Sequence, residues 1–267
     1  GQASSRKKML EKMELEDIPV TSRKFPYVGF QPEREIGNFV LTAEKLNSKD
    51  DDGNVLLNDF SITIHPGEKV AFVGMEHNSI TSFFDIVSET KKPESGTYSW
   101  GQTTSHSYMG RDNSAYFNNE LTITDWLKQY SPDQDDAYVR GFLGRMLFSG
   151  DDGLKKVKVL SGGEKVRCML SKMMLSGANV LILDDPTNHL DLESIESLNE
   201  GLVKFPGVVM FSSHDHEFIS TIANRIIEIT PKGIIDRMMN FDDYLKDDQV
   251  KQLRKEYYAG LNKKIRI

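Results

Sequence analysis

The sequence lacks the features that stabilise or anchor secreted and membrane proteins. Cys168 is the single cysteine among 267 residues, so no disulfide can form within the chain. No apolar run approaches the ~20 residues that a membrane-spanning helix requires. The chain does not begin with Met, and Gly1–Ser5 contains no apolar signal core. These absences predict a cytoplasmic protein, and we expect the chain to be part of a longer one.

Acidic residues outnumber basic ones, but not evenly along the chain. The net charge is −7, yet residues 1–12 carry four basic and one acidic side chain, and residues 251–267 carry six and one. The remaining residues, 13–250, therefore carry 23 basic and 38 acidic side chains. An acidic body with basic ends fits two interpretations: two solvated tails, or contact with an anionic surface such as RNA.

Hydrophobic patterning predicts one large α/β domain behind a flanking segment. A helix is expected at 4–16, followed by a proline-rich connector at 18–38. Short apolar or alternating segments predict strands at 39–46, 55–64, 69–74, 180–183 and 208–211. The stretch at 120–178 has a helical pattern. Unbroken apolar strands that alternate with helices indicate a parallel sheet covered on both faces.

The segment Leu160-Ser161-Gly162-Gly163-Glu164 carries the strongest chemical signal. Ser161 and Glu164 have the spacing of a capping box, and apolar residues at helical spacing follow. An ordinary capped helix does not explain two glycines in its first turn, where each costs roughly 1 kcal/mol relative to alanine. Glycines there allow a phosphate to approach bare N–H groups at the positive end of a helix. We therefore favour a phosphate-binding helix start.

Two adjacent carboxylates follow the apolar strand at 180–183. Asp184 is placed to hold a phosphate-bound Mg²⁺, and Asp185 could orient an attacking water. The alternative is a turn in which acidic residues cap the next helix, which fits Asp191 well and Asp184 poorly. His214 follows the next apolar strand, where it could donate to a γ-phosphate, although such a histidine is more often structural.

In this order and spacing, LSGGE, DDPTNHLDL and SSHD resemble the signature, the Walker B motif with its D-loop, and the switch histidine of ATP-binding-cassette (ABC) ATPases. Asn188–Asp191 and the basic stretch Arg6–Met13 are similar to the ABC-F class, soluble proteins with two cassettes joined by a helical linker, many of which act on ribosomes. Phe142–Gly150 and Val157–Ser171 resemble the second cassette of the YbiT-like branch.

The resemblance implies an α/β P-loop NTPase fold of the ABC type, with a mixed sheet core and an inserted helical signature subdomain at about 120–178. It assigns 1–17 to the end of the linker, 39–245 to the cassette and 246–267 to a basic tail.

It also implies ATP and Mg²⁺ as cofactors and gives each motif residue a role. Nucleotide-binding positions are Gly74, Ser79, Ile80, Thr81, Ser82 and Arg111. Metal-binding positions are Thr81 and Asp184, and catalytic positions are Asp185 and His214. The signature residues are Ser161, Gly162, Gly163 and Glu164, and the D-loop residue is Asp191.

The phosphate loop departs from its family pattern, G-x-x-x-x-G-K-[ST]. Gly74 and Thr81 fit, but Ser79 replaces the second glycine, Ile80 replaces the lysine, and Glu76 adds a negative charge. A helix is expected only from Thr81 onwards.

Three further positions near the expected nucleotide also differ from the family. Asp185 stands in place of a catalytic glutamate, and Arg111 in place of the Q-loop glutamine. The turn at 47–54 has no aromatic residue for an adenine. This half's own ATP site is therefore expected to be weak or inactive.

Because ABC cassettes pair head to tail, the signature of this chain is expected to complete an ATP site on the first cassette of the same full-length chain. A ribosome or other RNA is a further expected partner, through the basic linker. The alternatives are an ATPase subunit of a transporter and a structural half that binds no nucleotide.

Overall fold

The computed structural model describes residues 2–6, 8, 26–261 and 263–267. The chain divides into two compact units. One contains Gly1–Arg34, Asp112–Asn179 and Pro186–Pro206, and the other contains Glu35–Arg111, Val180–Asp185 and Gly207–Ile267. We call them the helical unit and the sheet unit, and describe each by itself. Among the described residues, no helix is both long and apolar enough to cross a membrane.

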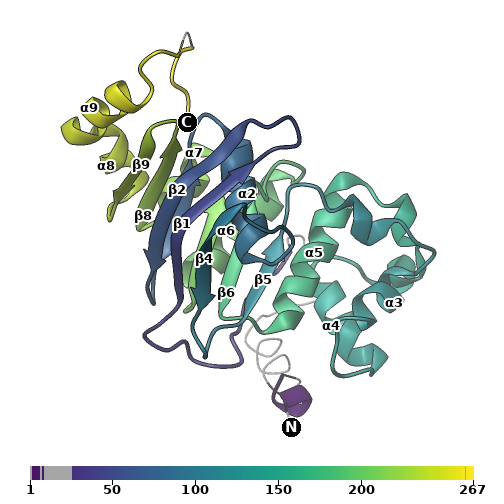
Figure 1. Cartoon of the computed structure of the whole chain (residues 1–267). Helices are drawn as coiled ribbons and strands as arrows, with labels where there is room; N and C mark the ends of the chain where they lie inside the picture. The colour runs from purple at the N-terminus through teal and green to yellow at the C-terminus, as the bar shows by residue number, and fades with distance from the viewer. Residues whose placement is uncertain (1, 7, 9–25, 262) are drawn as a thin grey trace. The chain divides into compact units, whose positions relative to one another are not determined.

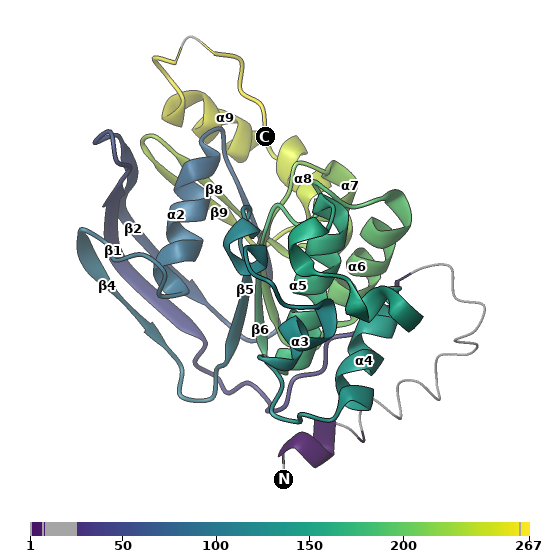
Figure 2. The same ribbon diagram turned by 90° about the vertical axis from the view of Figure 1, so that its right-hand side faces the viewer.

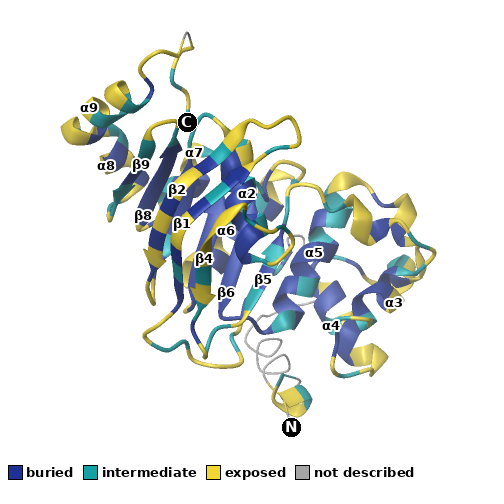
Figure 3. Cartoon of the chain, viewed as in Figure 1, coloured by how far each residue is buried: buried dark blue, intermediate teal, exposed yellow. Residues whose placement is uncertain are grey.

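A six-stranded sheet forms the centre of the sheet unit (Figure 1), in the order β5-β6-β7-β3-β8-β9. Its strands are β3 (Lys69–Val73), β5 (His106–Met109), β6 (Val180–Asp184), β7 (Val208–Ser212), β8 (Arg225–Thr230) and β9 (Gly233–Arg237). All neighbours are parallel except β8 and β9. Every residue of β6 and β7 is buried, which explains their unbroken apolar sequences. Figure 3 shows this burial for β6.

A second, antiparallel sheet has the order β2-β1-β4. Its strands are β1 (Leu41–Lys49), β2 (Val55–Ile64) and β4 (Ser95–Trp100). Helix α2 (His77–Val87) lies between the two sheets (Figure 2). Phe83 of α2 contacts Phe60 of β2 and Phe72 of β3, with ring centroids 4.8 and 5.3 Å apart. The two sheets therefore both pack on α2, and these contacts fix the position of the helix between them.

The C-terminal helices are fastened to β8 by a buried carboxylate. The helices held in this way are α8 (Phe241–Lys246) and α9 (Asp248–Tyr257), whereas α7 (His216–Ile222) precedes β8 in the chain. Glu228 of β8 is fully buried and accepts hydrogen bonds of 2.6 Å from the hydroxyls of Tyr244 and Tyr258. Arg254 Nε lies 3.2 Å from the same carboxylate. Part of the segment expected to be a tail at 246–267 is thus folded against the sheet.

Besides the helical residues 2–6 and 8, the described part of the helical unit contains four α-helices and three short 3₁₀ helices. The α-helices are α3 (Ile123–Lys128), α4 (Asp136–Arg145), α5 (Gly162–Ser176) and α6 (Leu192–Lys204), and the 3₁₀ helices span Ser114–Phe117, Gly150–Leu154 and Val157–Val159. Trp126 is fully buried in this unit and stacks on Phe117 with centroids 5.0 Å apart.

The N-terminal segments belong to the helical unit. Residues 2–6 and 8 are helical, and the rest of the helix expected at 4–16 lies outside the described residues. Arg6 pairs with Glu33 and donates to the carbonyl oxygen of Ser176 at the end of α5. Val28 of the connector packs so closely on Gly201 of α6 that a Cβ there would lie 2.6 Å from the Val28 carbonyl oxygen. The described part of the connector is therefore packed structure.

The expected fold class is confirmed: a mixed sheet carries the phosphate-loop position after β3, and a helical segment contains Ser161 at the start of its long helix. All five expected strands are present, with bounds shifted by at most three residues. Four strands, β4, β5, β8 and β9, were not predicted because they are short or half-polar. Helix α2 begins at His77, four residues before the expected start.

We expect Tyr258→Phe to lower the free energy of unfolding by about 1–3 kcal/mol, because the buried Glu228 loses a donor. Tyr257→Phe is the matched control, since the hydroxyl of Tyr257 makes no hydrogen bond to the described residues. Urea unfolding of both variants measures the difference, and equal stability would contradict the role of this bond.

The buried hydroxyls of Tyr244 and Tyr258 should also make the free energy of unfolding depend on pH. Burial first, and the charge of Glu228 next, raise the pKa of both Tyr244 and Tyr258 above the ordinary value. A raised pKa means that their contribution is complete below the unfolded value of about 10 and falls as the pH rises beyond it.

Candidate functional site

The candidate site lies where parallel strands of the sheet unit end. Asp184 is the last residue of β6 and pairs with Ser212, the last residue of β7. Strand β3 pairs in parallel with β7 and ends at Val73, directly before Gly74. The carboxyl ends of parallel strands form one edge of a sheet, which is where ligands bind in open α/β folds. The structure therefore brings the two expected motifs, at Gly74 and Asp184, to the same edge.

The carboxylate of Asp184 is fully buried and receives three polar contacts. Thr81 Oγ1 donates to Oδ2 at 2.6 Å, and Ser212 Oγ donates to Oδ1 at 2.8 Å. His77 Nε2 lies 2.6 Å from Oδ1. A buried carboxylate must be hydrogen-bonded or neutralised, and these side chains do so from α2 and β7. The two expected Mg²⁺ ligands, Thr81 and Asp184, are thus bonded to each other.

Sequence reasoning gave His77 no role. Its ring is also 5.3 Å from that of His214, centroid to centroid. His214 is exposed after β7, as expected for a residue at the strand end. The signal that would have identified His77 is its place at the start of the helix that follows the first glycine, facing a strand that ends in a carboxylate.

The loop that follows β3 is short, and its end is capped by a carboxylate. Only Met75 and Glu76 separate Gly74 from α2, and Glu76 caps this helix by accepting a hydrogen bond of 3.2 Å from Asn78 N. The anion-binding end of the helix is therefore occupied by a side-chain carboxylate of the chain. Gly74 has φ +150°, and a Cβ there would lie 2.5 Å from the Ile229 carbonyl oxygen, so close packing on β8 requires glycine at this position.

Two expected nucleotide-binding side chains point elsewhere. Ile80 is buried in the hydrophobic core between the sheets. Ser82 is buried as well; its hydroxyl lies 2.8 Å from Ser48 Oγ and accepts from Lys91 Nζ at 3.0 Å. Both side chains are therefore engaged within the sheet unit, and their expected role toward a nucleotide stays a prediction. Ser79 is buried in the first turn of α2, with its N–H donating to the Glu76 carbonyl oxygen at 3.1 Å.

The backbone of Asp185 is left-handed, with φ +50°. Its N–H donates to Ser212 Oγ at 3.0 Å. Aspartate and asparagine enter the left-handed region more readily than glutamate. The local backbone thus gives a physical reason for aspartate where the family has glutamate. Arg111 is exposed two residues after β5, at the same sheet edge.

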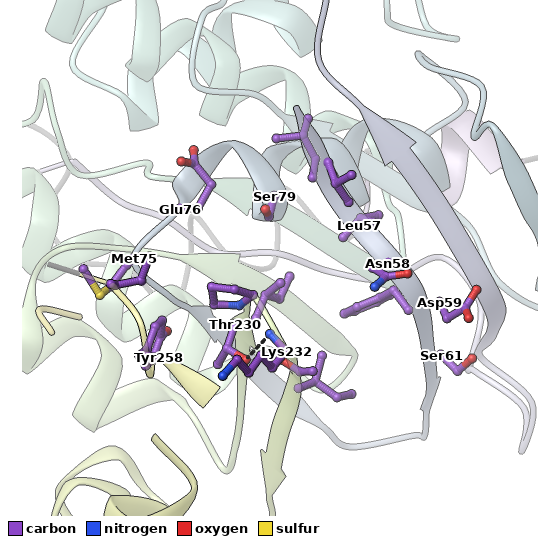
Figure 4. Close-up of a pocket in the computed structure, with 18 of the residues that line it drawn as sticks. Leu57, Asn58, Asp59, Ser61, Met75, Glu76, Ser79, Thr230, Lys232 and Tyr258 are labelled. Carbon is purple, nitrogen blue, oxygen red and sulfur yellow. Dashed lines mark hydrogen bonds between the residues drawn. The ribbon is translucent and has the colours of Figure 1, made fainter. Parts of the chain in front are cut away.

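A pocket of about 700 Å³ opens beside the phosphate-loop position (Figure 4). Glu76 and Ser79 line it from the loop and from α2, and Tyr258 lines it from the C-terminal segment. Its remaining walls come from β2, from the turn between β8 and β9, and from Leu261 and Lys263. A volume of this order is typical of small-molecule sites, so the pocket is large enough to hold a small molecule.

The signature segment forms a regular helix start within the helical unit. Ser161 is the N-cap of α5 and accepts a hydrogen bond of 3.2 Å from Glu164 N, while Glu164 Oε1 accepts one of 3.0 Å from Ser161 N. The hydrogen bond from the Ser161 backbone lowers the pKa of Glu164. Gly162 and Gly163 form the first turn of a 15-residue helix. Asp191 caps α6 by accepting from Ser194 N at 2.8 Å.

Comparison with known proteins agrees with this arrangement of motifs. Residues 57–188 match the family model described as ABC transporter. The chain carries an ABC ATPase domain. The matched residues include the loop after β3, the signature and the two carboxylates, and ATP hydrolysis is the activity of this family.

Curated relatives match nearly the whole chain. The uncharacterized ABC transporter ATP-binding protein YkpA of Bacillus subtilis is 56% identical over 97% of this chain and 48% of its own length. The probable ATP-binding protein YbiT of Escherichia coli O157:H7 is 40% identical over 92% and 46%. The energy-dependent translational throttle protein EttA of Escherichia coli K12 is 31% identical over 80% and 39%. The chain spans about half or less of the length of these relatives.

Solved cassettes share the fold. The ATP-binding cassette MJ0796, whose structure is a dimer bound to ADP and Pi, has a TM-score of 0.61 at 15% identity, over 75% of this chain and 99% of its own. The cbiO1 protein of Clostridium perfringens has a TM-score of 0.58 at 17% identity, over 84% and 96%. At these identities the likeness concerns the fold alone.

The residues at the phosphate-loop position do not fit Mg-ATP. A carboxylate caps the helix end, no lysine is present, and the buried oxygens of Asp184 are already engaged by this chain's own side chains.

We expect the chain to bind Mg-ATP with a Kd of about 0.1 mM or weaker, as measured by calorimetric titration. The pair Ser79→Gly with Ile80→Lys is expected to unfold at a lower temperature than the parent without binding tightly, because a lysine then lies in an apolar core. Adding Glu76→Gly and His77→Gly to this pair releases the helix end and Asp184, and should tighten binding at least about tenfold. Low-micromolar binding by the unmodified chain would contradict this account.

Proposed function

We propose that this chain is one half of a two-cassette ABC-F ATPase, and that its main catalytic contribution is to complete the ATP site of a partner cassette. The observation that carries the proposal is the contrast between its two motifs. The phosphate-loop position is closed by Glu76 and by the contact of His77 with Asp184. The signature keeps its serine, glycines and capped helix start.

The role of the signature follows from the start of α5. The first N–H groups of a helix have no intrahelical acceptor, and the helix dipole adds partial positive charge at this end. Ser161 supplies a hydroxyl at the same point. In a head-to-tail pair, these groups would face the γ-phosphate held by the partner, where positioned donors stabilise the charge that develops during phosphoryl transfer.

The proposal gives the chain's own ATP site a minor role. Asp185 is one methylene shorter than the family's glutamate, so a water that glutamate could reach lies about 1.5 Å farther from its carboxylate. Misplacement of that size can cost about 100-fold in rate. A half that binds no nucleotide and only supports its partner is the second candidate, and the closed loop favours it over a transporter subunit.

We further propose a cytoplasmic, translation-related role, in which the basic N-terminal segment contacts ribosomal RNA. The name of EttA, a translational throttle protein, supports this direction. Arg6 is taken by Glu33 and the end of α5, so it is not available to RNA. Lys8, in the same segment, is exposed. Lys7 and Lys12 lie outside the described residues.

Two substitutions in the two-cassette protein separate the sites. Ser161→Arg should block closure over the partner's ATP and abolish most turnover, by at least about 100-fold. Asp185→Asn keeps the side-chain shape and suits a left-handed backbone, so it should change turnover less than about threefold. Steady-state ATP hydrolysis measures both. If Asp185→Asn is the more damaging, this chain's own site is the catalytic one and the proposal fails.

The ribosome contact is tested by salt dependence. Binding of the two-cassette protein to ribosomes should weaken as salt rises, and Lys8→Glu should make the slope of log K against log salt shallower by about one. Lys92→Glu, an exposed lysine of the sheet unit, is the control with the same change of charge. Equal slopes for both variants would remove the N-terminal segment from the contact.

A further inference from the structure

The structure supplies a reason for the signature glycines that lies within this chain. His189 belongs to the turn Pro186–His189, which leads from Asp185 to α6. A Cβ built on Gly162 would lie 3.3 Å from Cγ and Nδ1 of the His189 ring. A Cβ built on Gly163 would lie 2.8 Å from the His189 carbonyl oxygen. Both glycines therefore provide room for His189: Gly162 for its ring, and Gly163 for its backbone carbonyl group.

We infer that His189 is a positioning residue that holds the turn Pro186–His189 against the first turn of α5. The turn is closed by a hydrogen bond of 3.2 Å from Leu190 N to the Thr187 carbonyl oxygen, and it ends at Asp191, the N-cap of α6. Arg167 of α5 contributes to lowering the pKa of Asp191, after the hydrogen bonds from Ser194. A charge interaction thus also links α5 to Asp191, two residues after this turn.

The functional part of this inference rests on the proposed role of the signature in ATP hydrolysis. Pro186 follows Asp185 directly, so the turn connects the end of β6 by chain continuity to the residue that packs on the signature. The ring of His189, which lies in the same chain, packs beside Gly162. This contact fixes the position of the first turn of α5 relative to α6. Placement of donors to within about 1 Å governs rates of transfer reactions.

The two contacts differ in kind, which gives a decisive experiment on the chain alone. His189→Ala removes the ring but leaves the carbonyl group. In this background, Gly162→Ala should raise the Tm by about 2–4 °C, because alanine is the better helix former and nothing opposes its Cβ. In the parent, Gly162→Ala should leave the Tm unchanged or lower it. Gly163→Ala should lower the Tm in both backgrounds, since the His189 carbonyl oxygen remains.

The functional readout uses the two-cassette protein. His189→Ala should lower kcat by about tenfold and change KM for ATP less than twofold, with little change in Tm. His189→Phe keeps a flat ring over Gly162 and should retain most of kcat. Loss of activity in His189→Phe would assign the effect to a ring nitrogen and overturn the positioning role.

Failure of this inference and failure of the proposed function give different results. If the effect of Gly162→Ala on Tm is the same in both backgrounds, the ring does not occupy the space above Gly162 and the inference is wrong, whatever the signature does. If the Tm pattern holds while Ser161→Arg leaves turnover intact, the packing of His189 stands and the proposed role of the signature is wrong.

Discussion

The buried carboxylate of Asp184 sets the arrangement of the candidate site. Strand β6 must be apolar on both faces to occupy the middle of the sheet, yet it ends in a charged group with no exposure to water. Desolvation of a carboxylate is tolerated only with hydrogen bonds or a counter-charge. Thr81 and His77 from α2 and Ser212 from β7 provide the contacts, and in doing so they join the start of α2 to two strand ends.

His77 adds a contact to this carboxylate. In the family pattern, a phosphate-bound Mg²⁺ and the lysine of the loop place positive charge near this carboxylate. Here an imidazole lies 2.6 Å from it, and the helix that carries the imidazole begins directly after Glu76. His77 therefore reaches the carboxylate from the first turn of α2.

Sequence reasoning succeeded where a local pattern determines the structure. The unbroken apolar runs at 180–183 and 208–211 predict buried strands because a parallel sheet covered on both faces requires such sequences. The capping box at Ser161 and Glu164 is likewise local, and both of its hydrogen bonds are present. For the glycines beside it, the sequence predicts only a role in phosphate binding. Their contact with His189 joins segments 26 residues apart, and neither segment has a sequence pattern that indicates it.

The phosphate-loop position shows why the rest could not be predicted. An alignment of the loop on Gly74 and Thr81 treats each departure from the family pattern as a separate substitution. It assumes that the backbone of the loop stays open. In the structure, α2 begins at His77, Ile80 is buried in the core of the sheet unit, and the hydroxyl of Ser82 lies 2.8 Å from Ser48 Oγ. The surroundings of these positions depend on packing between segments that are distant in the sequence, which the pattern of the loop does not contain.

The phosphate-loop position and the signature differ in how the residues around them are packed. A phosphate loop needs open backbone and a flexible cation, whereas α2 is held from both sides by Phe60, Phe72 and the residues around them. Returning one position to the family pattern therefore works against a packed core until the start of the helix is released as well. The signature has no such conflict, because Ser161 caps α5 and the space above Gly162 and Gly163 is filled from the same unit. The start of α5 and the loop after β3 are therefore stabilised by separate sets of contacts, each within its own unit.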